Sequence, residues 1–308
     1  MRTPPSFDLE RVVRSHGWYD LAPWSWDPVR RVVGRPLRLA PGRVVHVEVA
    51  APGPGRLLLR VTAPGGTARA GQGRAAEAEA VRHAVRTCLA LDEDLGPFRE
   101  RARAVEGVGG PTPVQGALDR GLGRLLRSPT VFEDAVKTLC TTNCSWALTR
   151  SMVSRLVESL GEQGPSGRAF PAPEALASRP ERFFRDRVRA GYRAPFLRSL
   201  ARDVARGALD PESWRDPSIP AAELRRRILA LDGFGPYAAE HLMRLLGRHE
   251  GLALDSWTRK KIAGLRGRKR VPADRTFARW YAPWGEWAGL AMWLEATADW
   301  HGDAPAWP

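Results

Sequence analysis

The chain has 308 residues, 43% of them hydrophobic and 27% charged, which excludes a disordered or fibrous protein and allows about two domains. Forty-eight Lys and Arg against 34 Asp and Glu give a formal net charge of +14, which favours a polyanionic partner, nucleic acid first. No apolar run is long enough to span a membrane, the first residues lack a signal core, and three cysteines cannot build a disulfide framework or a four-cysteine iron–sulfur site. We therefore expect a reduced, cytoplasmic protein.

Alternating apolar residues at 44–49 and 56–61, joined by a Pro- and Gly-rich turn, predict an antiparallel hairpin with one buried face. From about residue 76 the apolar spacing becomes helical. We expect residues 1–92 to form a sheet domain with a flanking helix, and residues 93–308 to be mostly helical.

Apolar stripes and capping residues predict further helices. They fall at 129–140, opened by Ser128 or Thr130, and at 146–160, 194–205, 221–231 and 284–300.

Residues 224–247 contain two helical stretches separated by Gly233-Phe234-Gly235 and then Pro236. Proline suits the first turn of a helix, and glycine accepts backbone conformations that other residues resist. The second helix would point its free amides outward, where they can bind a phosphate.

Leu231, Gly233, Phe234, Gly235 and Ala239 match the Leu-x-Gly-φ-Gly-x-x-x-Ala pattern of the helix-hairpin-helix. An Asp at a helix start soon after such a hairpin, here Asp255, resembles the helix-hairpin-helix DNA glycosylase superfamily. Residues 128–139, 140–145, 170–177 and 191–194 also resemble family segments, so the likeness spans roughly residues 75–300. The N-terminal strands fit the sheet domain of the alkylpurine and 8-oxoguanine branches.

The resemblance implies an α+β fold: a small N-terminal antiparallel sheet on a two-lobed helical body with a six-helix lobe at about 128–247. It implies that a monomer binds double-stranded DNA containing a damaged base, in the nucleoid. The implied DNA contacts are Gly233, Phe234, Gly235, Tyr237, Ala238, Asn143, Arg259 and Lys260. Asn143 would fill the gap left by the flipped base, although a plain loop asparagine is the alternative.

The resemblance assigns catalysis to Asp255. Cleaving an N-glycosidic bond develops positive charge on the sugar, and a carboxylate about 4 Å away contributes roughly 4 kcal/mol at an effective dielectric of about 20. The same carboxylate could orient or deprotonate water. Aspartate is also a preferred helix cap wherever helices begin, so a purely structural role is the alternative.

Tyr237 stands where bifunctional members of the superfamily carry a Schiff-base lysine. The expected enzyme is therefore monofunctional, a 3-methyladenine glycosylase II-like hydrolase acting on an alkylated or otherwise modified purine. A bifunctional 8-oxoguanine glycosylase with lyase activity and a non-catalytic lesion binder remain alternatives. Tyr237 and Trp257 are the expected base-pocket residues, and His241 and His249 are expected to be structural.

The chemistry requires no cofactor and the chain is expected to lack an iron–sulfur cluster. The resemblance further implies a structural Na⁺ or K⁺ at the hairpin. Main-chain carbonyls of Leu229, Leu231 and Phe234 would bind it.

Overall fold

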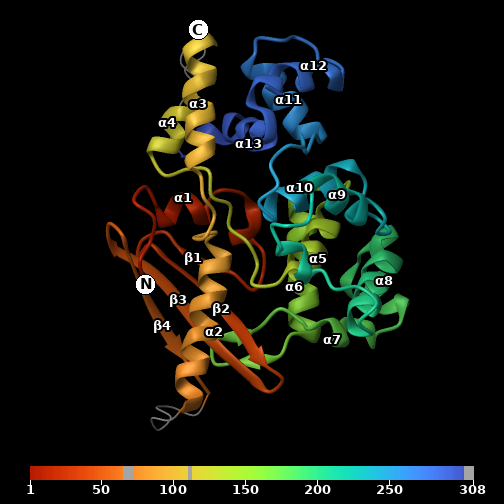
Figure 1. Cartoon of the computed structure of the whole chain (residues 1–308). Helices are drawn as coiled ribbons and strands as arrows, with labels where there is room; N and C mark the ends of the chain where they lie inside the picture. The colour runs from red at the N-terminus through yellow and green to blue at the C-terminus, as the bar shows by residue number, and fades with distance from the viewer. Residues whose placement is uncertain (65–71, 110–112, 302–308) are drawn as a thin grey trace.

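The computed structural model describes residues 1–64, 72–109 and 113–301, and Figure 1 shows a sheet and a long helix at one side of a helical body. Four strands, β1 (Ser25–Asp27), β2 (Val32–Ala40), β3 (Arg43–Gly53) and β4 (Arg56–Thr62), form one antiparallel sheet in that order. The expected hairpin is β3 and β4, with Val49 opposite Leu59. The α+β expectation is confirmed.

Thirteen α-helices lie within the described residues. They are α1 (Leu9–Val13), α2 (Gln72–Cys88), α3 (Gly96–Gly109), α4 (Pro113–Asp119), α5 (Val131–Thr141), α6 (Trp146–Leu160), α7 (Pro173–Ala177), α8 (Ala194–Ala205), α9 (Ala221–Leu229), α10 (Pro236–Leu245), α11 (Ser256–Leu265), α12 (Asp274–Tyr281) and α13 (Ala288–Thr297). Shorter elements are the strands β5 (Gln163–Gly164) and β6 (Gly167–Arg168), the π-helical segment η2 (Phe183–Val188), and the 3₁₀ turns η1 (Gly17–Asp20), η3 (Gly191–Arg193), η4 (Glu212–Arg215), η5 (Ala282–Trp287) and η6 (Ala298–His301).

Local side-chain hydrogen bonds fix where the predicted helices begin. The Thr130 hydroxyl accepts from the Glu133 amide at 3.2 Å, so Thr130, not Ser128, caps α5. Ser145 caps α6 in the same way, through the amide of Leu148. Each cap satisfies an amide that the first turn of a helix leaves unpaired.

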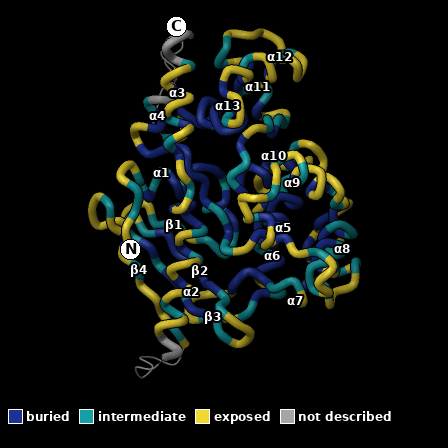
Figure 2. Tube along the Cα trace, in the orientation of Figure 1, coloured by how far each residue is buried: buried dark blue, intermediate teal, exposed yellow. Residues whose placement is uncertain are grey.

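Two hydrophobic cores hold the chain together. The larger joins the sheet to α5, α6, α8, α9 and α10, and includes Trp18, Leu37 and Phe132. The smaller joins α3 and α4 to α11, α12 and α13, and includes Phe98 and Ile262. In Figure 2 the trace of α5 and of α13 is dark blue, as expected for the central helix of each core.

A buried ionic cluster connects the sheet to the larger helical lobe. The Arg35 guanidinium on β2 donates to both Glu133 oxygens at 3.1 and 2.8 Å, and Lys137 Nζ donates to Glu133 at 2.7 Å. Burial opposes the charged form of Glu133, but the two neighbouring cations lower its pKa. The cluster satisfies charges that would be costly to bury alone.

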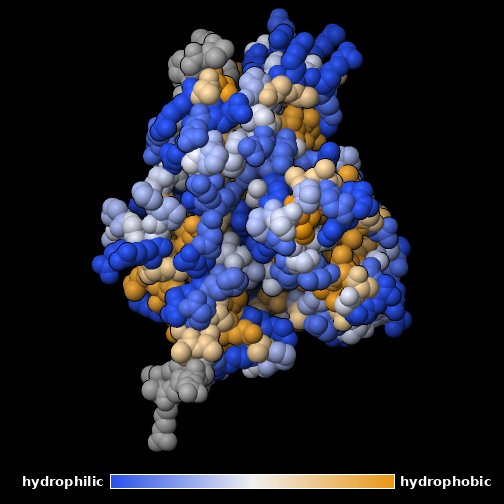
Figure 3. All heavy atoms as spheres, viewed as in Figure 1, coloured by the Kyte–Doolittle hydropathy of each residue, from blue (hydrophilic) through white to orange (hydrophobic). Residues whose placement is uncertain are grey.

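The surface is mostly hydrophilic in the view of Figure 3, especially over α11 and α12 at the top. Apolar atoms gather over the edge strand β4, where Leu58 and Val61 are exposed. None of the helices in the described residues has the length and apolarity required to cross a membrane.

Candidate active site

Asp255 is the N-cap of α11 and lies on the wall of a cavity. Its Oδ1 accepts a hydrogen bond from the Thr258 amide at 2.7 Å, and no donor is within hydrogen-bonding distance of Oδ2 among the described residues. One oxygen therefore holds the helix start, and the other is available to a ligand.

The cavity has a volume of about 620 Å³, within the range of small-molecule sites. Its walls come from the segment before and within η1, the α5–α6 loop, one face of α10, the start of α11, and the end of α13 with η6. The lining residues are Arg14, His16, Gly17, Trp18, Tyr19, Asp20, Thr141, Cys144, Trp146, Thr149, Tyr237, His241, Arg244, Ala253, Asp255, Trp257, Thr258, Trp293 and Trp300.

Aromatic rings form the buried wall. Ring centroids of His16 and Trp18 are 4.7 Å apart, those of Trp18 and His241 are 5.0 Å apart, and Tyr237 stacks on His241 at 6.1 Å. The Trp18 indole donates to Asp134 at 2.7 Å, which fixes its orientation. These rings pack against one another and give the cavity an aromatic lining.

Both histidines of this wall are neutral near pH 7. Burial lowers the pKa of His16 to about 3, although its Nε2 lies 2.6 Å from the Leu126 carbonyl. Burial also lowers the pKa of His241 well below its ordinary value. A structural role was expected for His241, but the structure places it in the cavity wall. The signal in the sequence was its position one helical turn after Tyr237.

Tyr237 lines the same cavity as Asp255. Burial and the negative charge of Asp255 raise the pKa of the Tyr237 phenol to about 12, although a hydrogen bond with Thr141 acts in the opposite direction. Tyr237 is therefore a neutral phenol near pH 7.

Tryptophans form the outer rim. Trp257 is 40% exposed, and its ring centroid is 5.6 Å from that of Trp300 and 6.1 Å from that of Trp293. Trp146 also lines the cavity, and its indole donates to Asp20 at 2.8 Å. Sequence reasoning placed Trp257 in the pocket but missed the other three, because the packing that brings them together is long-range.

The hairpin between α9 and α10 gives its two glycines different roles. Gly233 has φ of +85°, and a Cβ there would lie 2.6 Å from the Phe196 ring. Gly235 has nothing within 4 Å of an added Cβ, so the space before α10 is open. The Phe234 and Ala238 side chains are buried, so these residues offer only their backbone to a ligand.

Asn143 is exposed, has φ of +44°, and is not among the cavity-lining residues, although Thr141 and Cys144 on either side of it are. Its Nδ2 donates to the Tyr192 hydroxyl at 3.3 Å. Tyr192 is 49% exposed, and its hydroxyl also lies 3.0 Å from the Thr142 hydroxyl. Sequence reasoning did not single out Tyr192.

Arg259 and Lys260 differ in availability. The Arg259 guanidinium donates to both Asp274 oxygens at 2.8 Å and to the Leu254 carbonyl at 3.0 Å, so it is committed within the protein. Lys260 is exposed and has no ion-pair partner in the part of the chain that the structure describes.

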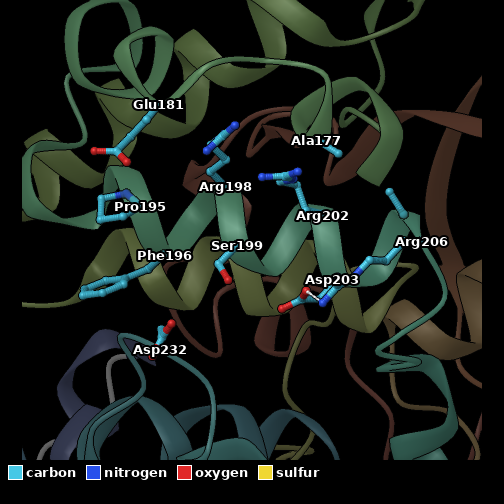
Figure 4. A pocket seen from close by; sticks show the side chains of 11 residues that line it. Ala177, Glu181, Pro195, Phe196, Arg198, Ser199, Arg202, Asp203, Arg206 and Asp232 are labelled. Atoms are coloured by element: carbon cyan, nitrogen blue, oxygen red, sulfur yellow. Dashed lines mark hydrogen bonds and ion pairs between the residues drawn. The ribbon is translucent and has the colours of Figure 1, made fainter.

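A second cavity, of about 730 Å³, lies on the outer face of α8 beside the hairpin residue Asp232 (Figure 4). Figure 4 shows Arg198 and Arg202 on its upper side and the Asp203–Arg206 ion pair within it. Both acidic and basic groups line it, and Asp255 is not one of its residues. It is therefore separate from the candidate active site.

Comparison with known proteins gives a match in structure alone. The sequence matches no family model, and no curated protein matches it. The fold is similar to that of the 3-methyladenine DNA-glycosylase from Archaeoglobus fulgidus, with a TM-score of 0.72 and 17% identity over 97% of this chain and 98% of that chain.

It is also similar to the 8-oxoguanine glycosylase/lyase from Clostridium acetobutylicum in its apo-form, with a TM-score of 0.70 and 17% identity over 96% of this chain and 94% of that chain. The same Clostridium enzyme in complex with double-stranded DNA containing cytosine opposite 8-oxoG gives a TM-score of 0.68 at 17% identity, over 97% of this chain and 93% of that chain.

Proposed function

The chain has the fold of the helix-hairpin-helix DNA glycosylases, and from that premise we propose that it is a monofunctional glycosylase of base-excision repair. It hydrolyses the N-glycosidic bond of a damaged purine, alkylated or otherwise modified, that has been flipped out of duplex DNA. The observation that carries the proposal is the placement of the Asp255 carboxylate on the wall of an aromatic cavity large enough for a base.

The cavity supplies the two interactions that base removal needs. A flipped base can stack on the aromatic side chains of this wall, Trp18, Tyr237 and His241, and this offsets the cost of leaving the duplex stack. The Asp255 carboxylate then opposes the positive charge that grows on the sugar as the bond breaks. At about 4 Å and an effective dielectric of about 20, this stabilisation is roughly 4 kcal/mol, or about a thousandfold in rate.

The positions of the lysines support water, and not a lysine amine, as the nucleophile. All four, Lys137, Lys260, Lys261 and Lys269, lie in described segments, and none lines the cavity. Lys137 is buried in the ionic cluster with Glu133, and Lys261 pairs with Asp299 at 2.6 Å. A bifunctional enzyme forms a Schiff base through a nucleophilic amine, and no lysine amine lines this cavity.

The hairpin and α11 supply groups for the DNA backbone. The amides of Tyr237 and Ala238 lie in the first turn of α10, before the first intrahelical bond at Ala239, and Gly235 leaves space for a phosphate. Exposed cationic side chains lie in α11, in the segment after it and in α12, at Lys260, Arg268, Lys269, Arg270 and Arg275. Affinity for duplex DNA should therefore fall steeply with salt.

A monovalent cation at the hairpin, Na⁺ or K⁺, is part of the proposal. Within the described residues no N–H is hydrogen-bonded to the carbonyl of Leu229 or Phe234, and the Leu231 carbonyl accepts one bond, from the Phe234 amide at 3.1 Å. These carbonyls fit a cation that would support a nearby phosphate.

Asn143 and Tyr192 are proposed to enter the gap in the duplex. Their hydrogen bond places an amide and an exposed aromatic ring on one loop cluster beside the cavity. The amide can bond the partner base that has lost its mate, and the ring can stack on a neighbouring base.

The test is base release from otherwise identical duplexes carrying 3-methyladenine, 7-methylguanine, hypoxanthine, 1,N6-ethenoadenine or 8-oxoguanine. We expect release of at least one purine and an intact abasic strand until alkali is added. Strand cleavage without alkali would favour the bifunctional alternative. Tight lesion binding with no base released from any duplex would favour the non-catalytic lesion binder.

A further inference from the structure

Arg244 is a buried cation on the wall of the base cavity. It is 2% exposed, and its guanidinium carbon is 5.2 Å from the ring centroid of Trp293, another lining residue. Its Nε and Nη2 have no hydrogen-bond partner, and no carboxylate in the described chain lies within ion-pair distance of it. A buried guanidinium without a carboxylate is rare because its desolvation is not repaid within the protein.

The other charges of the cavity are accounted for. Arg14, at the rim, pairs with Glu10 at 3.3 Å, and Asp20 accepts from Trp146 and pairs with Arg150 at 3.2 Å. Asp255 is the acid at the sugar side in the proposed function.

The two histidines of the wall contribute no positive charge, because burial lowers the pKa of both. Burial also lowers the pKa of Arg244, but only to about 10, so the guanidinium stays charged near pH 7. Arg244 is thus the unpaired cation of the base cavity within the described residues.

We propose that Arg244 determines which damaged purine the enzyme accepts: a neutral purine bearing a carbonyl oxygen, such as hypoxanthine or 8-oxoguanine, in preference to a cationic N-alkylpurine such as 3-methyladenine or 7-methylguanine. This inference rests on the proposed function. A cationic base would meet a positive charge that Asp255 and Glu240 offset only from beyond ion-pair distance, in a cavity of low dielectric where like charges repel strongly. A carbonyl oxygen would provide the acceptor that the guanidinium lacks.

The same charge assists the chemistry of a neutral base. When the bond between the sugar C1′ and the purine N9 breaks, both electrons go to N9, so the base leaves as an anion and the sugar becomes a cation. Arg244 stabilises the anion and Asp255 the sugar cation. Water then adds its oxygen to C1′ and gives one proton to Asp255, from which it passes to solvent, and the purine anion takes up a proton. A cationic base leaves as a neutral molecule and gains nothing from Arg244.

The test compares single-turnover release, corrected for spontaneous loss, from duplexes carrying hypoxanthine, 8-oxoguanine, 7-methylguanine or 3-methyladenine. The proteins are the full chain, Arg244→Met, Arg244→Lys and Arg248→Met. Arg248 is the matched control, because it lies four residues after Arg244, beyond the end of α10 and outside the cavity, and donates to the carbonyls of Asp216 and Ile219. Thermal melting and binding to an abasic-site duplex check that every variant is folded.

We expect the unaltered protein to release at least one of the two neutral bases at least tenfold faster than either cationic base. Arg244→Met should slow that release by roughly 100-fold, the size of effect found when one donor to a developing negative charge is removed. It should leave release of cationic bases unchanged or faster. Arg244→Lys should retain most of the preference, and Arg248→Met all of it.

Faster release of a cationic base by the unaltered protein would overturn this inference and leave the glycosylase proposal standing. An equal loss on neutral and cationic bases in Arg244→Met would do the same. Release of no base from any duplex would overturn both.

Discussion

Tyr237 and Asp255 face the same cavity, and burial together with the Asp255 carboxylate raises the pKa of the Tyr237 phenol to about 12. One residue comes from the second helix of the hairpin and the other from the start of α11. The helix proposed to bind the DNA strand and the acid proposed to act on the sugar therefore contribute to the same cavity.

Replacing Asp255 with Asn should separate capping from catalysis. Asn caps helices about as well as Asp, so the free energy of unfolding should change by less than about 0.5 kcal/mol. Base release should fall roughly a thousandfold because the negative charge is lost. Single-turnover kinetics and thermal melting measure the two effects. Asp255→Ala is the comparison: it should lose activity and also about 1 kcal/mol of stability. Activity retained in Asp255→Asn would rule out the proposed electrostatic role.

The two hairpin glycines should respond differently to the same substitution. Gly233→Ala places a methyl group 2.6 Å from Phe196 at a φ of +85°, so it should destabilise the fold by more than about 1 kcal/mol. Gly235→Ala has open space and should melt normally, yet bind duplex DNA more weakly because its methyl group occupies the proposed phosphate position. Melting and fluorescence-anisotropy titrations measure the pair. Unchanged DNA affinity in Gly235→Ala would place the strand elsewhere.

Borohydride should trap no covalent adduct between the protein and an abasic duplex. The cavity offers the neutral phenol of Tyr237 and no lysine amine, and a Schiff base needs an amine. Tyr237→Phe should keep base release within about tenfold, since a phenol whose pKa is raised to about 12 is a poor proton donor and is not a base near pH 7. A trapped adduct in the unaltered protein would contradict the assignment of water as the nucleophile.

Acidification should destabilise the fold through the buried wall of the cavity. The pKa of His16 is lowered from 6.5 to about 3, so the unfolded chain binds more protons than the folded one between these values. Stability is therefore full above about pH 6.5 and falls as the pH drops toward 3, by an amount on the order of several kcal/mol. His16→Gln should flatten this dependence. Denaturant unfolding between pH 7 and pH 4 measures it, and identical slopes for the two proteins would contradict the assignment to His16.

Local signals in the sequence predicted the hairpin, the caps of α5 and α11, and the strand pair β3–β4. Each depends on backbone conformation or on a hydrogen bond within a few residues, so short stretches of chain carry the information. Asp255, Tyr237 and Trp257 could be placed near one another because the hairpin and the helix start are close in the chain. The predicted end of α9, at Leu231, was two residues too late, because Ala230 and Leu231 already belong to the turn toward Gly233.

Which side chains line the cavity was decided by the tertiary structure. His16 and Trp18 come from the N-terminal segment and Trp293 and Trp300 from the last helical turns, and no local pattern relates residues so far apart. No local pattern in the sequence distinguishes Arg244 from the many other arginines of this basic chain. The packing of α10 against these distant segments buries its guanidinium, and no carboxylate of the described residues forms an ion pair with it. The hairpin and the helix-capping Asp255 depend on local backbone conformation, whereas the proposed selectivity of the cavity depends on burial by residues far apart in the chain.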